Sequence, residues 1–211
     1  MRKIILIVTT LFLISLLHAE PLNTFRFGFF VPSATGIGTI TGYSYGARFD
    51  DRITIYTSGD LFYRNYTKEK RIGYISGGGQ TTVETYLKTT DISTYYLPIM
   101  VNGQIHIPIE GEFPIYVGGG FGIGLLWDDV YVASDHTHLP VNETKFFSGF
   151  NWNLCIGTRY ELSRYTAIIG ELFYHNGSMR RDVLVTPVGI TWHEINMDGI
   201  GMRVGLEVPA F

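Results

Sequence analysis

The feature that most constrains this chain is a two-residue alternation of apolar and polar side chains that recurs along almost its whole length. Successive side chains of a β-strand point to opposite faces, so the alternation predicts strands whose two faces meet different environments. The segments that follow it are 25–31, 43–49, 53–64, 95–107, 115–127, 150–162, 168–175 and 200–208. We therefore predict an all-β chain of eight strands, an even number typical of single-chain barrels that cross bacterial membranes.

Residues 1–19 have a different character from the rest of the chain. Two cations precede an apolar run from Ile4 to Leu17, and Ala19 supplies a small residue where a signal peptidase would cut. We expect a cleavable signal peptide over 1–19 and a single domain over 20–211. No other segment has the roughly 20 consecutive apolar residues of a transmembrane helix, so entry into a membrane would require a barrel.

Composition narrows the class of protein further. Aromatic residues make up 15% of the chain and charged residues 17%. This balance is unusual for a soluble protein and natural for one with a lipid-facing surface. The formal net charge of -3 offers no basic patch for nucleic acid. The only cysteine, Cys155, excludes an intrachain disulfide and is expected to be a small buried residue.

The apolar faces carry tyrosine and tryptophan, mostly toward the strand ends. Such residues mark the two membrane–water interfaces of a barrel, which indicates that the apolar face points outward to lipid. A soluble barrel with its apolar face inside is the structural alternative. The predicted aromatic girdle is Tyr43, Tyr63, Tyr95, Trp127, Trp152, Tyr160 and Tyr174.

The polar faces combine small residues with charges of both signs. An eight-stranded barrel is just wide enough for side chains to fill, so opposite charges inside would pair and plug it. A water-filled channel is the alternative. We expect Glu171 to be the partner of Arg159, and the glycines of 118–124 to make room for interior arginines. The predicted interior polar network is Arg26, Arg48, Asp60, Arg159, Glu171, Arg203 and Glu207.

The predicted connections are of two kinds. Short links alternate with long polar ones, as in barrels with short periplasmic turns and longer outer loops. We expect any surface recognition to lie in the loops 68–84 and 128–145. The short links are 50–51, 109–113 and 163–164, and the long ones are 67–82, 128–145 and 177–191, with a brief glycine-rich loop at 33–41.

One candidate metal site stands in the third long loop. Residues 135–138 read Asp-His-Thr-His, with Asp128, Asp129 and Glu143 nearby, and histidines with carboxylates can bind a transition metal. The loop has no rigid element to fix the ligand geometry, so we favour a solvated loop and predict no metal and no cofactor.

Several segments resemble a known group of proteins. Tyr95-Tyr96-Leu97-Pro98-Ile99 is similar to a Tyr-Leu-x-x-Pro-Leu-like element of the porin-family outer-membrane β-barrels. Residues 147–162, with a Gly157-x-x-Tyr160 tail, and 199–211 resemble the sixth and last strands of that group, typified by OmpX and the transmembrane part of OmpA. The resemblance implies an eight-stranded barrel in the bacterial outer membrane, surrounded by lipid and lipopolysaccharide.

The resemblance also implies insertion by the outer-membrane assembly machinery through a C-terminal strand that ends in Phe211. One feature departs from the expected signal. Positions counted back in twos from Phe211 are Pro209, Glu207, Gly205 and Arg203, which are not apolar. The apolar set lies in the other phase, and a bulge at Pro209 would reset it.

A second, weaker resemblance concerns catalysis. The segment from Tyr174 to Ser178 is similar to the His-x-Ser-Asn element of lipid A deacylases, in which base and nucleophile share one strand face. Here Ser178 lies three residues after His175, on the opposite face of a regular strand. We therefore interpret the segment as a strand end and turn, and predict no enzyme.

The functional expectation is an outer-membrane barrel with a plugged polar interior that acts as an integrity protein or through its surface loops, with an unknown surface ligand. A narrow channel for small solutes is the first alternative. An acyl hydrolase that uses His175 is the second.

Overall fold

The computed structural model describes most of the chain beyond the predicted signal peptide. No helix within these ranges is long and apolar enough to cross a membrane. The predicted signal peptide, 1–19, and the terminal Phe211 lie outside them. The described residues are 20–49, 52–76, 82–107, 114–133, 141–163, 166–186 and 189–209.

The described ranges contain nine strands, and every pairing between them is antiparallel. Their length exceeds the usual strand of about five or six residues, because each runs through a barrel wall and some continue beyond it. The strands are β1 (Glu20–Pro32), β2 (Gly38–Arg48), β3 (Ile53–Ser76), β4 (Thr82–Ile107), β5 (Ile115–Val132), β6 (Val141–Ser163), β7 (Thr166–Thr186), β8 (Gly189–Asn196) and β9 (Gly199–Pro209).

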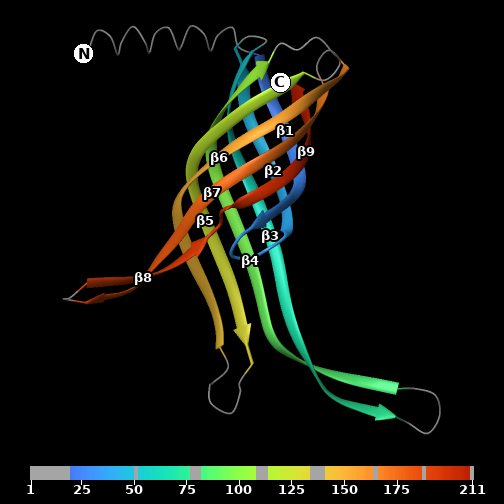
Figure 1. The fold of residues 1–211 in the computed structure, drawn as a ribbon, viewed down its shortest axis with the longest axis vertical. Coiled ribbons are helices and arrows are strands. Elements are labelled where there is room, and N and C mark those ends of the chain that lie inside the picture. The colour runs from blue at the N-terminus through green and yellow to red at the C-terminus, as the bar shows by residue number, and fades with distance from the viewer. Residues whose placement is uncertain are drawn as a thin grey trace.

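Eight of the strands close into a ring. Neighbours follow the order β6-β5-β4-β3-β2-β1-β9-β7, and β7 pairs back with β6 (Figure 1). β8 pairs only with β7, from Ser178 to Thr186, while β9 pairs with the preceding part of β7. Met197 and Asp198 separate β8 from β9. β8 therefore extends the last strand of an eight-stranded, up-and-down barrel, and the predicted fold class is confirmed.

The barrel has two distinct ends. At the terminal end β1 begins and β9 finishes, with Leu22 opposite Pro209. At the hairpin end lie the β1–β2 turn and the β3–β4, β5–β6 and β7–β8 hairpins. The β3–β4 and β7–β8 hairpins project away from the barrel in Figure 1.

The predicted long loops are wrong in extent. β3 continues to Ser76 and β4 begins at Thr82, so most of 67–82 is paired strand. The same holds for 128–145 and 177–191, which belong mainly to β5–β6 and β7–β8. Apolar and polar residues do not alternate regularly in these segments, yet pairing still satisfies their backbone hydrogen bonds.

The two faces of the strands follow the predicted phase. On β1, Phe25 and Phe27 are 57% and 53% exposed, whereas Arg26 between them is 4% exposed. The same contrast recurs around the ring, from Phe150 on β6 to Ile200 on β9. Large apolar side chains therefore cover the outside of the barrel, and charged, small and some buried aromatic side chains face its interior.

The glycine face of β5 does not make room for arginines, contrary to the prediction. A side chain at Gly120 would meet the Asn102 amide, and one at Gly124 would meet Tyr96 and Met179. Polar, aromatic and sulfur side chains of β4 and β7 occupy this space. The glycine-face prediction fails because the arginines enter from β1, β2, β6 and β9 and do not lie against these glycines.

Candidate functional site

An ion network crosses the middle of the barrel interior. The Arg203 guanidinium on β9 donates to Asp60 on β3 at 3.0 Å and contacts Glu171 on β7, its register partner. Arg26 on β1 lies 3.3 Å from the same Asp60 carboxylate. All four side chains are at most 4% exposed. Buried charges are tolerated only when paired, so this network fixes the positions of four strands relative to one another.

A second ionic group lies near the terminal end. Glu207 on β9 accepts hydrogen bonds at 2.9 Å from Arg48 on β2 and from Arg159 on β6. Arg159 also contacts Glu161. The predicted partnership of Arg159 with Glu171 is wrong, because the β6–β7 register places Gly157, not Arg159, opposite Glu171.

A neutral hydrogen-bond chain lies beyond the ion network toward the hairpin end. The Tyr96 hydroxyl is 2.7 Å from Nε2 of His175, and the Asn151 amide donates to that hydroxyl at 3.1 Å. His175 is 3% exposed. Its ring packs edge-on against Phe30, with ring centroids 5.6 Å apart. His175 therefore belongs to the packed interior.

The predicted strand end at 174–178 is wrong, since β7 continues to Thr186. The Ser178 hydroxyl donates to Glu194 on β8 at 2.6 Å, on the opposite face of β7 from His175. This hydrogen bond, with Arg180, lowers the pKa of the exposed Glu194 carboxyl below its usual value. His175 and Ser178 are not brought together as a base and a nucleophile.

An apolar plug lies in the barrel interior between the ion network and the hairpin end. Its side chains come from seven strands and the β8–β9 break, and Phe30 packs edge-on against Phe62 with centroids 5.6 Å apart. Phe62 and Leu126 are 0% exposed. The plug consists of Phe30, Ile40, Phe62, Tyr96, Leu126, Phe147, Met179 and Met197.

The cavities among the interior side chains are small. One of about 20 Å³ adjoins Arg26 and Glu207, and one of about 10 Å³ adjoins Asp60 and His175. Each has room for about one water molecule. Little space therefore remains between the side chains around these ionic groups.

A larger cavity of about 420 Å³, which we call the hairpin-end cavity, lies at the hairpin end. Arg64 and Tyr66 of β3 and Asp128 of β5 face it together with Thr35 of the β1–β2 turn. The sequence prediction missed this cavity. Arg64 shares the inward parity of Asp60, which was a usable signal, but nothing in the alternation links it to a turn residue.

Two rows of side chains mark where the apolar outer surface ends. Neighbouring strands place Tyr63, Tyr95, Trp127 and Phe146 in register, an aromatic row. Two residues further along each strand toward the hairpin end, the outward-facing side chains form a polar row in the same register, Asn65, Ser93, Asp129 and Thr144. The Asn65 amide donates to the Ser93 hydroxyl at 2.9 Å, and the Thr144 hydroxyl donates to Asp129 at 2.7 Å. On each of these four strands, the outward side chains change from aromatic to polar within two residues.

The remaining predicted girdle residues are spread over both halves of the barrel. Trp152 and Tyr174 contact each other from β6 and β7, with ring centroids 5.6 Å apart. Tyr43 packs on Phe25 at 5.1 Å. Tyr160 lies nearer the terminal end of β6, opposite Ile168. All four point outward.

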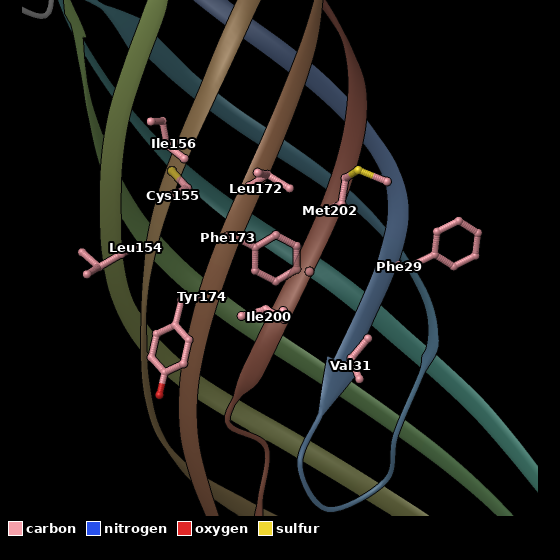
Figure 2. Close-up of a pocket in the computed structure, with 11 residues that line it drawn as sticks. Phe29, Val31, Leu154, Cys155, Ile156, Leu172, Phe173, Tyr174, Ile200 and Met202 are labelled. Carbon is pink, nitrogen blue, oxygen red and sulfur yellow. The ribbon is translucent and has the colours of Figure 1, made fainter.

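An apolar groove lies on the outside of the barrel wall. Figure 2 shows side chains such as Leu154, Leu172 and Met202 projecting around a groove over β6, β7, β9 and β1, with a volume of about 580 Å³. Gly201 forms part of its floor, and the Phe173 ring lies behind that glycine. The groove is continuous with the exposed apolar surface.

The candidate metal loop, 135–138, lies outside the described residues. Of its described neighbours, Asp129 accepts a hydrogen bond from Thr144. Glu143 forms ion pairs with Lys145 and Arg181. Across the described ranges, no group of three histidine, cysteine, aspartate or glutamate side chains is arranged to hold a metal ion.

A closed antiparallel barrel with an ion-paired interior and an apolar, aromatic-bordered exterior has the architecture of outer-membrane β-barrel proteins. Solved structures of that class share it. A major outer membrane protein from Thermus thermophilus aligns with a TM-score of 0.59 at 11% identity, over 91% of this chain and 99% of that chain. Neisserial surface protein A (NspA) aligns with a TM-score of 0.54 at 11% identity, over 91% and 97%.

The outer membrane protein OprG from Pseudomonas aeruginosa aligns with a TM-score of 0.52 at 13% identity, over 91% of this chain and 96% of that chain. No family model and no curated protein sequence matches this chain. At these identities the likeness establishes the fold.

Proposed function

We propose that this chain is an integral protein of the bacterial outer membrane whose barrel is closed, and that it acts as a structural element of the membrane and through its surface hairpins. The observation that carries the proposal is the filled interior. The apolar plug and the ion network lie in series along the barrel, with cavities of only about 20 and 10 Å³ among them. The neighbouring folds support a membrane barrel.

The exterior supports contact with lipid and lipopolysaccharide. Outward apolar side chains, including Phe150 at 63% and Ile200 at 66% exposure, would lie against acyl chains. The aromatic row would lie at the interface of the outer leaflet, with the polar row in the headgroup region. The groove in Figure 2 lies within this surface, so acyl chains are its natural occupants.

Delivery to the membrane forms part of the proposal. Residues 1–19 would be removed on export, which leaves 20–211 as the barrel domain. The assembly machinery would then take up the last strand. Met202, Val204 and Leu206 are the outward residues of β9, one position out of phase with Phe211, so we expect recognition to tolerate this shift.

The hairpins beyond the polar row are the surfaces available for recognition. Exposed ion pairs join them, including Arg180 with Glu194 at 2.9 Å and Arg181 with Glu143 at 3.3 Å. Such exposed pairs contribute little to stability, because water screens them. They leave the hairpins polar, well solvated and accessible to a partner.

The closed barrel is tested by single-channel recording of the mature chain in a planar bilayer, with heat-modifiable gel mobility as proof of folding. We expect a folded protein without conductance steps. Reproducible steps from folded protein would overturn the closed interior and establish a narrow channel instead.

The location and orientation are tested by labelling single cysteines in a Cys155→Ala background. Thr144→Cys lies in the polar row, and Ser163→Cys lies at the terminal end; both positions are exposed. A membrane-impermeant maleimide added to intact cells should label the first and spare the second until the cells are permeabilised. The reverse pattern would contradict the orientation, and labelling of neither site in permeabilised cells would contradict the exposed placement.

A further inference from the structure

The hairpin-end cavity contains polar groups without partners. The Arg64 guanidinium lies over the Tyr66 ring, 5.8 Å from its centroid, and beside Gly36, and it makes no ion pair with a carboxylate in the described part of the chain. Oδ1 of Asp128 and Oγ1 of Thr35 are both buried without a hydrogen-bond partner. Buried polar atoms are nearly always satisfied in native proteins, so two such atoms beside an arginine without a carboxylate partner indicate a place for a bound polar molecule.

The charges of the cavity restrict what that molecule can be. Glu194 also lines it, but its carboxylate is already occupied by Ser178 and Arg180. One cation, Arg64, and one carboxylate, Asp128, remain. A simple anion would be attracted by Arg64 and repelled by Asp128, and a simple cation would meet the reverse. A molecule with one charge of each sign complements both.

The strand register sets the two charges on one wall. Arg64 of β3 is paired with Thr94 of β4, which is paired with Asp128 of β5. Two strand spacings separate the backbones of Arg64 and Asp128 by about 10 Å, and the long arginine stem spans part of that distance. Thr94 lies between them as the register partner of both residues, and Oδ1 of Asp128 is left without a hydrogen-bond partner.

The rest of the cavity wall is apolar. Ile92 of β4 and Ile195 of β8 line it. The volume of about 420 Å³ lies within the range of small-molecule sites, which are mostly apolar with a few placed polar groups. An aliphatic side chain on a charged backbone fits this combination.

We propose that the hairpin-end cavity binds a small zwitterion of the α-amino-acid type with an apolar side chain. Its carboxylate accepts from Arg64, its ammonium group donates to Oδ1 of Asp128, and its side chain lies against Ile92 and Ile195. Thr35 supplies a further hydrogen bond. This inference goes beyond the proposed function, because a closed membrane barrel does not require a ligand site.

The test is calorimetric titration of the refolded mature barrel in detergent with three matched probes. L-leucine carries both charges, N-acetyl-L-leucine lacks the ammonium group, and L-leucinamide lacks the carboxylate. We expect saturable binding of leucine and at least about tenfold weaker binding of each blocked probe, since one charge-assisted hydrogen bond contributes about 1.5–3 kcal/mol. Equal binding of all three probes, or no binding of leucine to folded protein, would overturn the proposal.

Variants assign each charge to its residue. Arg64→Gln should weaken leucine binding at least about tenfold while leaving leucinamide binding nearly unchanged, because leucinamide has no carboxylate to lose. Asp128→Asn should do the same for leucine and spare N-acetyl-leucine. Arg181→Gln removes an arginine that pairs with Glu143 and does not line the cavity, and it should leave binding unchanged.

Heat-modifiable mobility separates lost binding from lost folding in every variant. Leucine binding that is unaffected by both cavity variants would refute the assignment. If leucine does not bind a folded barrel that shows no conductance steps, this inference is refuted but the proposal of a closed barrel is not.

Discussion

Arg203 and Glu171 lie directly opposite each other on β9 and β7, with their charged groups in contact inside the barrel. The pair joins the last strand of the chain to its neighbour, and Arg203 extends the connection across the interior to Asp60 on β3. One guanidinium therefore links three strands, so its removal has consequences that differ from the removal of a surface charge.

Replacing Arg203 by methionine should destabilise the folded barrel by about 3–5 kcal/mol, because it leaves buried carboxylates without their cation. The double variant with Glu171→Gln should be more stable than the single one, since Asp60 then still has Arg26. Urea unfolding in lipid vesicles measures both. Arg180→Met, which breaks an exposed pair with Glu194, is the control and should leave the stability nearly unchanged, because water screens a surface ion pair. A double variant as unstable as the single one would contradict the network.

Placing a cation on the outer wall should prevent stable folding in a bilayer. Leu154 is 58% exposed, and Leu154→Arg should cost roughly 2–4 kcal/mol if it faces the middle of the membrane. Thr144→Arg, in the polar row, should cost about 1 kcal/mol or less because it lies outside the hydrocarbon. Folding yield and stability in vesicles measure the two. Equal behaviour of these variants would show that the outer wall does not face lipid.

The apolar plug should stabilise the barrel without acting as its only seal. Phe62→Ala should cost about 3–5 kcal/mol, whereas Phe150→Ala, on the exposed outer wall, should cost less because lipid fills the vacated space. We expect Phe62→Ala to show no conductance steps in bilayer recordings, because the ion network still fills the barrel between the plug and the terminal end. Conductance steps from the folded variant would identify the plug as the only barrier.

Gly36 should be intolerant of a side chain. It has a φ of 77°, and a Cβ there would lie 3.2 Å from Nη1 of Arg64. Gly36→Ala should cost about 1–2 kcal/mol through the left-handed backbone, and Gly36→Asn should cost less because asparagine adopts that conformation more readily. Thermal unfolding measures the costs. If alanine and asparagine are equally tolerated, the turn does not hold this backbone conformation.

The faces of the strands could be predicted because lipid and a charged interior impose opposite polarity on alternate residues. That contrast places Phe25 outside and Arg26 inside from local sequence alone. The partner of Arg159 could not be predicted in this way. Glu171 and Glu207 share its parity, and only the register of the strands, which depends on the whole ring, brings Glu207 within 2.9 Å.

The hairpin extensions and the hairpin-end cavity were missed for a related reason. Around Asn65 and Asp129 the outward face becomes polar, so the alternation of apolar and polar residues ends although the strands remain paired. The cavity depends on Thr35 in a turn and Ile195 beside the β8–β9 break, two segments far apart in sequence that meet only when the ring closes.

The seam between β1 and β9 gives the barrel a particular assembly problem. Eleven register pairs, from Leu22 with Pro209 to Pro32 with Gly199, join the first strand to the last. A chain without residues 199–209 lacks the β9 partner of β1 and leaves two open sheet edges, which can pair with other chains. The barrel therefore cannot close one part at a time. The open edge of its first strand must be kept from pairing with other chains until the last strand is present to pair with it.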